Sequence, residues 1–166
     1  MATIVTDGLE LRPLVPEDAD EMAAVLGDER LHAFTGGHPL SPEQLRTRYE
    51  RLAGGRSADG TEQWCNWIVR VQPGGDAVGF VQATVTDAGG AATVAWVVGV
   101  PWQGQGYAAE AAVGVVDWLA GAGVRTIEAH IYPDHDASGR VAARAGLEPS
   151  ADVVEGEVVW RRPAVA

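Results

Sequence analysis

An amphipathic helix enclosed between two strand-like segments constrains the fold of this chain more than any other feature. Its apolar residues recur at positions i, i+3, i+4, i+7, i+8 and i+11, and they are Ala108, Ala111, Ala112, Val115, Val116 and Leu119. Gly121 and Gly123 end the helix, and strand-forming segments flank it at residues 92–98 and 126–131. Strand, crossover helix and strand make a βαβ unit, so we expect these two strands to be parallel or nearly adjacent. Glu110 lies on the opposite side of the helix and is expected to be solvated.

The remaining segments predict an α+β fold around this unit. Helical patterns cover residues 16–26, 41–52 and 137–145, and the second begins with a capping box made by Ser41 and Gln44. Strand patterns separated by turn residues lie at 9–14, 67–71, 77–86, 92–98, 126–131, 148–153 and 157–162. We therefore expect a mixed, mostly antiparallel sheet of about seven strands with about four helices.

Charge excludes several classes of function. The chain has 12 basic and 23 acidic residues, a formal net charge of -11, and every basic residue is an Arg. Without Lys, neither Schiff-base chemistry nor a P-loop lysine is available. Nucleic-acid binding needs a basic patch, which this composition argues against. An acidic surface suits a protonated amine or a basic peptide as substrate, although solubility alone explains the charge more simply.

Other features of the composition predict a cytoplasmic setting. Cys65 is the only cysteine, which excludes an internal disulfide and favours a reducing compartment. No apolar run is long enough to cross a bilayer, and the first ten residues lack the pattern of a secretory signal. We expect one cytoplasmic domain, residues 1–166, with no membrane partner. The His spacing makes no case for a metal site.

The turn before the long helix is the strongest candidate for a binding site. Gly104 and Gly106 let main-chain N–H groups crowd together, and the helix N-terminus adds unpaired donors and its positive dipole end. Together they predict a cradle for a diphosphate that needs no basic side chain. From the residues alone, the turn could hold any phosphate group, including that of a dinucleotide, because Ala109 fits the looser form of the dinucleotide-binding fingerprint. It could also be an ordinary turn before a helix.

Three segments resemble the GNAT acetyltransferase superfamily. Gln103-Gly-Gln-Gly-Tyr-Ala108 is similar to its (Gln/Arg)-x-x-Gly-x-(Gly/Ala) signature, placed between a strand and the long helix. Residues 132–147 are similar to its Asn-x-x-Ser segment, short helix and Gly-Phe, with His135 in place of the Asn. Residues 9–14 resemble the opening of the ribosomal-protein N-terminal acetyltransferase branch. Position 142, a Tyr general acid in some relatives, is Ala142, so that role is absent or lies elsewhere.

The resemblance implies an N-acetyltransferase that moves the acetyl group of acetyl-CoA directly to an amine, with no acyl-enzyme and no metal. The residues implied in acetyl-CoA binding are Trp96, Val97, Val98, Gln103, Gly104, Gln105, Gly106, Tyr107, Ala108, Ala109, His135 and Ser138. A main-chain N–H around Val98 is the implied oxyanion donor. Ser138 is implied to protonate the leaving thiolate, although a residue that only caps its helix fits the position equally well.

His130 is the candidate general base. It aligns with a strand position where some relatives carry a catalytic Glu, and an imidazole suits removal of an amine proton near neutral pH. A packed strand histidine is the simpler interpretation, and Glu128 and Tyr132 share its strand face as weaker candidates. His32 and His38 lie in a loop that flanks the acceptor site in this family and are candidates for substrate contact, although exposed loop residues are the simpler interpretation.

Two other functions stay open on the sequence alone. One is an acyl-CoA-binding module without catalysis, because Ala142 and the uncertain base weaken the case for chemistry. The other is a nucleotide-binding protein of another class that uses the same Gly turn. The acceptor amine, small molecule or peptide N-terminus, is not identified, and the oligomeric state, a homodimer included, is left open.

Overall fold

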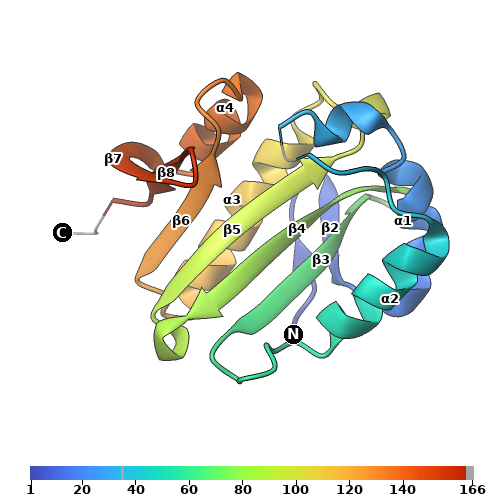
Figure 1. Cartoon of the computed structure of the whole chain (residues 1–166), viewed down its shortest axis with the longest axis horizontal. Coiled ribbons are helices and arrows are strands. Elements are labelled where there is room, and N and C mark those ends of the chain that lie inside the picture. The colour runs from blue at the N-terminus through green and yellow to red at the C-terminus, as the bar shows by residue number, and fades with distance from the viewer. Residues whose placement is uncertain (35, 164–166) are drawn as a thin grey trace.

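The computed structural model describes residues 1–34 and 36–163, which form one eight-stranded sheet with helices on both faces (Figure 1). The strands are β1 (Ile4–Val5), β2 (Leu9–Pro13), β3 (Gln63–Val71), β4 (Ala77–Thr86), β5 (Ala91–Val98), β6 (Thr126–Ile131), β7 (Glu148–Val154) and β8 (Glu157–Arg161). The α-helices are α1 (Ala19–Val25), α2 (Pro42–Ala53), α3 (Tyr107–Gly121) and α4 (Asp136–Arg144). Short 3-10 turns cover Pro16–Asp18, Glu29–His32, Asp87–Gly89 and Val100–Trp102.

The strand order confirms the predicted βαβ unit. The sheet runs β1-β2-β3-β4-β5-β6-β8-β7, and every neighbouring pair is antiparallel except β5 and β6. These two strands are parallel, and α3 connects them on one face of the sheet (Figure 1). The α+β class and four α-helices are as predicted. The eighth strand is β1, whose two residues are too few to produce a periodic pattern.

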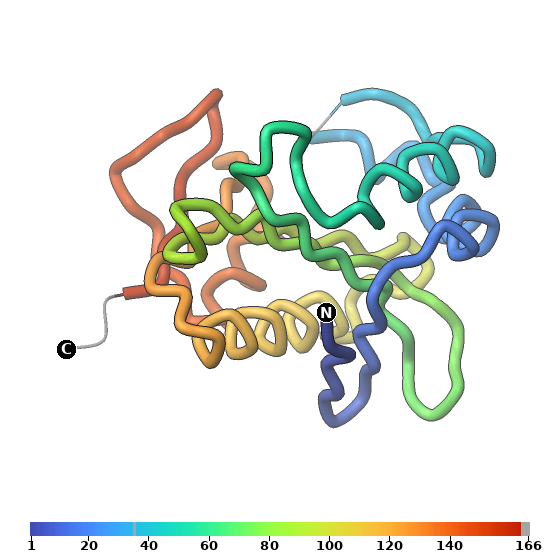
Figure 2. Tube along the Cα trace, turned by 90° about the horizontal axis from the view of Figure 1, so that it is seen from below, coloured from blue at the N-terminus to red at the C-terminus, as the bar shows by residue number. Residues whose placement is uncertain are grey.

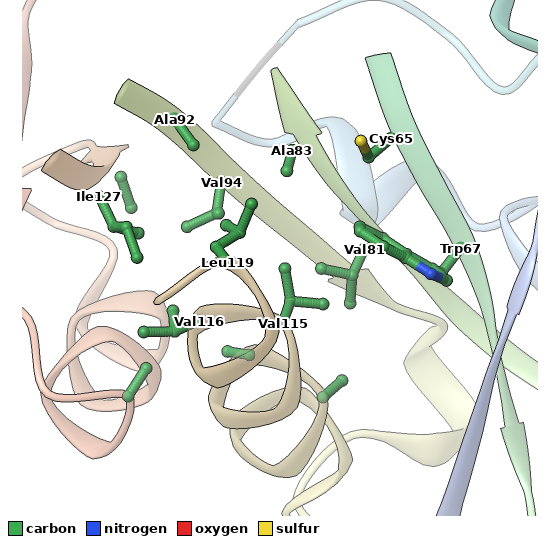
Figure 3. Packing of buried hydrophobic residues seen from close by; sticks show 14 of the residues in the cluster. Cys65, Trp67, Val81, Ala83, Ala92, Val94, Val115, Val116, Leu119 and Ile127 are labelled. Atoms are coloured by element: carbon green, nitrogen blue, oxygen red, sulfur yellow. The ribbon is translucent and has the colours of Figure 1, made fainter. Parts of the chain in front are cut away.

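The two faces of the sheet carry separate apolar cores. α3 and α4 cover one face and α1 and α2 cover the other (Figure 2). Figure 3 shows Val115, Val116 and Leu119 of α3 packing against the sheet, and each is at most 2% exposed. Burying a side chain of this size contributes about 1.5–3 kcal/mol, so the α3 face holds the βαβ unit firmly. On the other face, Leu45 and Tyr49 of α2 are buried, and the predicted Ser41–Gln44 capping box is present.

The predicted exposure of Glu110 is wrong. Its carboxylate is half-buried and accepts hydrogen bonds from Thr6 Oγ1 at 2.5 Å and from the Gly8 N–H at 2.6 Å. One turn further along α3, a Cβ placed on Gly114 would lie 3.1 Å from Thr6 Cγ2. The β1–β2 hairpin therefore covers the N-terminal part of the helix face opposite the core. The pairing spans about a hundred residues of sequence, so no local pattern could indicate it.

Candidate active site

An opening between β5 and β6 lies beside the predicted binding turn. Their ladder holds only three residue pairs and ends at Thr93 and Glu128, although β5 continues to Val98. The Gly99 N–H donates to the Val78 carbonyl on β4 at 2.8 Å. Because N–H groups alternate between the two edges of a strand, the Val98 N–H points towards β6, which no longer pairs with β5 at that level.

Gln103 completes this edge of β5. Its side-chain amide donates from Nε2 to the Val98 carbonyl at 3.0 Å. The carbonyl is thereby occupied while the Val98 N–H stays directed into the opening. The Trp96 side chain packs against the α3-face core, and the Val97 side chain lines a cavity on the other face. Trp96, Val97 and Val98 are consecutive, so this edge of β5 brings together a core contact, a wall of the cavity and the Val98 N–H.

The Gly-rich turn presents a row of unpaired donors. Gly104 and Gly106 have φ of 81° and 84°, in the left-handed region that favours glycine. The first intrahelical bond of α3 is from the Glu110 N–H to the Gly106 carbonyl. The six preceding N–H groups, residues 104–109, find no acceptor among residues 1–34 and 36–163. They sit at the N-terminus of a 15-residue helix, so the positive dipole end adds to a ready anion site.

His135 and Ser138 form a hydrogen-bonded pair at the start of α4. His135 Nδ1 accepts the Ser138 main-chain N–H at 3.4 Å, which makes the imidazole the cap of this helix. An accepting Nδ1 carries no proton, so Nε2 carries it and donates to Ser138 Oγ, 3.2 Å away. Burial lowers the pKa of His135, against the opposing charge of Asp136, which agrees with a neutral ring. The Ser138 hydroxyl proton is then left to donate elsewhere.

Phe34 covers this pair, which the sequence did not predict. Its ring stacks on the His135 imidazole with centroids 4.2 Å apart and planes 11° apart, and it lies 6.5 Å from the Tyr132 ring. Phe34 follows the Glu29–His32 turn between α1 and α2, about a hundred residues away in the chain. Such a distant pairing of two aromatic rings leaves no local signal in the sequence.

His130 of β6 belongs to a chain of polar contacts that continues to β8 and β7. Its Nε2 lies 3.1 Å from Glu128 Oε1, and the other oxygen of Glu128 accepts from Arg161 Nε at 3.0 Å. Arg161 also contacts Asp152 at 2.6 Å. Because Glu128 already pairs with Arg161, its carboxylate is an acceptor, and the Nε2 proton of a neutral His130 faces it. The remaining ring nitrogen, Nδ1, is then the one able to take a proton.

A cavity of about 480 Å³ lies on the same face of the sheet as His130. Ala129 and Ile131 belong to the α3-side core, so the alternating His130 faces the α1–α2 side. Ala95 and Val97 of β5 form the floor of the cavity next to the opening. The predicted substrate-flanking residues His32 and His38 both line it. The cavity and the Gly-rich turn thus approach the free part of β5 from different sides.

The described residues contain no candidate metal site and no candidate membrane span. Across residues 1–34 and 36–163, no three or more His, Cys, Asp and Glu side chains gather in a way that could hold a metal ion. In the same part of the chain, no helix combines the length and apolarity that a bilayer crossing requires.

Comparison with known proteins identifies the family of the chain. The family model described as "Acetyltransferase (GNAT) domain" matches residues 8–148. No curated protein sequence matches the chain significantly. Among solved structures, the ribosomal L7/L12 α-N-protein acetyltransferase RimL in complex with coenzyme A has a TM-score of 0.80 at 16% identity, with 98% of each chain covered.

Two further solved structures have the same fold. An acetyltransferase of the GNAT family from Bacillus anthracis has a TM-score of 0.78 at 15% identity, with 96% of each chain covered. The microcin C7 self-immunity acetyltransferase MccE, in complex with acetyl-CoA and AMP, has a TM-score of 0.76 at 13% identity, covering 96% of this chain and 94% of that one. Since the family model spans well over half of the sequence, the chain belongs to the GNAT family of acetyltransferases.

Proposed function

We propose that this acetyltransferase moves the acetyl group of acetyl-CoA to the nitrogen of a primary amine by direct attack. The observation that carries the proposal is the row of six unpaired N–H groups at residues 104–109, beside a strand edge that has lost its partner. Each hydrogen bond to a charged oxygen contributes about 1.5–3 kcal/mol, so several such amides can hold a diphosphate without a basic side chain. Acetyl-CoA combines a diphosphate with a slender arm that suits the opening between β5 and β6.

The acetyl group is assigned to the edge of β5. With the diphosphate on residues 104–109, the pantetheine arm follows the free part of β5, and the thioester carbonyl meets the Val98 N–H. The tetrahedral intermediate places a negative charge on that oxygen, which a fixed main-chain donor stabilises. The amine enters from the cavity floored by Ala95 and Val97, on the opposite side of the strand edge from the turn. Its nitrogen forms the new C–N bond in the tetrahedral intermediate, and the C–S bond breaks when the intermediate collapses.

Ser138 is the proposed donor to the leaving thiolate. Its oxygen accepts from His135 Nε2, which leaves the hydroxyl proton available for the sulfur. The proton lost by the amine passes to His130, and the proton gained by the sulfur comes from Ser138. His130 then releases its proton to solvent and Ser138 takes one up from solvent, so the reaction balances without an acyl-enzyme. Six further residues stay proposed contacts of acetyl-CoA, most of them through the main chain. They are Trp96, Val97, Gln103, Gln105, Tyr107 and His135.

Neither Cys65 nor Tyr49 is suited to form an acyl-enzyme in place of direct attack by the amine. Cys65 is 1% exposed in the α3-face core, and burial raises the pKa of its thiol. A buried thiol held protonated is a poor nucleophile. Burial, reinforced by the charge of Asp18, raises the pKa of Tyr49 to about 12, so its phenol stays protonated and does not act as a base near neutral pH.

A His130→Gln variant is expected to lower kcat/KM by about 100-fold, because a positioned general base typically contributes 100-fold or more. In the native enzyme the imidazole is the proposed acceptor of the proton that the amine loses. Glutamine keeps a polar group beside Glu128 but cannot take up the proton. The measurement is kcat/KM for the amine with both proteins, with their melting temperatures as the control for folding. An unaltered kcat/KM removes His130 from the role of base.

The function itself is tested by thiol release. Purified protein is mixed with acetyl-CoA and a panel of primary amines, and free CoA is measured together with the acetylated amine by mass spectrometry. We expect stoichiometric CoA and N-acetyl product with at least one amine. Calorimetric titration with acetyl-CoA and with ATP runs in parallel. Acetyl-CoA binding without any product would identify a binding module, and tight ATP binding without acetyl-CoA binding would replace the proposal.

A further inference from the structure

We propose that the acceptor is a primary amine on an apolar body that also carries a carboxylate, and that Arg48 binds this carboxylate. The inference rests on the proposed function, because it concerns the cavity from which the amine reaches the strand edge. It differs from the expectation raised by the overall charge, which favours cationic or basic substrates.

Apolar side chains make most of the cavity wall. Its volume of about 480 Å³ falls within the usual range of small-molecule sites, about 300–1,000 Å³. The apolar surface comes from α1, α2, the sheet and the segments that connect them. The apolar lining residues are Leu14, Ala23, Leu26, Leu31, Leu40, Leu45, Leu52, Phe80, Ala95 and Val97. Such walls favour an aliphatic or aromatic body and disfavour a polyhydroxylated or multiply charged one.

Among residues 1–34 and 36–163, no acidic side chain lines the cavity, although the chain has 23 acidic residues. A polyamine or a basic peptide would bring several positive charges into apolar surroundings with no carboxylate to pair them, which is costly. The net charge of -11 is therefore carried elsewhere on the molecule and does not describe the acceptor site.

Among the lining residues that the structure describes, Arg48 alone has a fixed charge, and that charge is positive. Arg48 projects from α2 into the wall of the cavity. Within residues 1–34 and 36–163, the ion pairs of α2 all involve Arg46, which contacts Glu17 and Glu50. Arg48 is left with its guanidinium available, and a planar guanidinium suits a carboxylate through two parallel hydrogen bonds.

A second polar group in the wall also lacks a protein partner. The Tyr49 side chain is 3% exposed and lines the cavity, yet its hydroxyl makes no hydrogen bond with any described residue. Its raised pKa keeps the hydroxyl protonated, so it offers a donor to the occupant. Arg48 and Tyr49 are neighbours on α2, and both offer donors to one anionic group.

Matched amines test the proposal directly. Acetylation is measured for phenylalanine against 2-phenylethylamine and for 8-aminooctanoate against octylamine, with spermidine as a polycation. Each pair keeps the apolar body and the primary amine and changes only the carboxylate, at a short and at a long spacing. At the spacing that fits, we expect kcat/KM about tenfold or more higher for the carboxylate-bearing member, and spermidine to be the poorest acceptor.

Variants on α2 assign that preference to Arg48. Arg48→Gln should bring the two kcat/KM values of the preferred pair together, and Arg48→Lys should keep part of the difference because the charge remains. Arg46→Gln is the matched control, since its guanidinium lies on the same helix but outside the cavity, and it should keep the full preference. The inference is overturned if the enzyme acetylates both members of each pair with the same kcat/KM. It is also overturned if the preference for the carboxylate-bearing member survives in Arg48→Gln. If no amine leads to release of CoA, the proposed function is overturned, and the inference is overturned with it.

Discussion

A Gly106→Val variant is expected to lose acetyl-CoA affinity by about 100-fold or more while keeping the fold. Gly106 has φ of 84°, and a β-branched residue avoids this conformation, so the turn must rearrange and misdirect its N–H groups. Losing two hydrogen bonds to charged oxygens, at about 1.5–3 kcal/mol each, accounts for that loss. A Cβ placed on Gly106 meets no atom within 4 Å, so no core contact is disturbed. Calorimetric titration with acetyl-CoA measures the effect.

Gly123→Val is the matched control for this prediction. Gly123 has φ of 92°, its Cβ would also lie in open space, and it follows the other end of α3. The same backbone cost of about 1–3 kcal/mol is expected in both variants, so both should show a similar fall in thermal stability. Only Gly106→Val should weaken acetyl-CoA binding. Equal affinities of the two variants for acetyl-CoA would show that the turn does not hold the cofactor.

A Ser138→Ala variant is expected to lower kcat by about 100-fold with little change in KM for acetyl-CoA. Without the hydroxyl the thiolate must leave unprotonated or take its proton from water, and general acid catalysis typically contributes 100-fold or more. The helix cap is preserved, because His135 accepts the main-chain N–H of residue 138 and not its side chain. Steady-state kinetics with a saturating amine measures the change.

Ser138→Thr separates proton donation from helix capping. Threonine keeps a hydroxyl on the same carbon, so it should restore a large part of kcat, and the melting temperatures of all three proteins should agree within a few degrees. A kcat that stays unchanged in Ser138→Ala would exclude the donor role. Equal losses in the alanine and threonine variants would point instead to a steric effect at this position.

The parts of the fold that are encoded locally could be predicted from the sequence. The α3 stripe, the Ser41–Gln44 capping box and the left-handed glycines of the turn each depend on residues close together in the chain. The parallel pairing of β5 and β6 followed from the intervening helix. These elements sufficed to predict the fold class and the family, and both are confirmed.

Features that join distant segments could not be predicted. The β1–β2 hairpin covers Glu110, and Phe34 covers His135, each across about a hundred residues. Arg48 has no local signal in the sequence, because a surface helix of this composition ordinarily carries such residues. Its significance depends on the cavity, which brings α1, α2 and the sheet together. The assigned roles of His130, Ser138 and the turn stay predictions.

The most direct test is a crystal structure of the protein with acetyl-CoA bound. We predict that the diphosphate oxygens lie about 3 Å from several main-chain nitrogens of residues 104–109, with the thioester oxygen at the Val98 N–H. A diphosphate held instead by arginine side chains, or lodged away from the start of α3, would contradict the account.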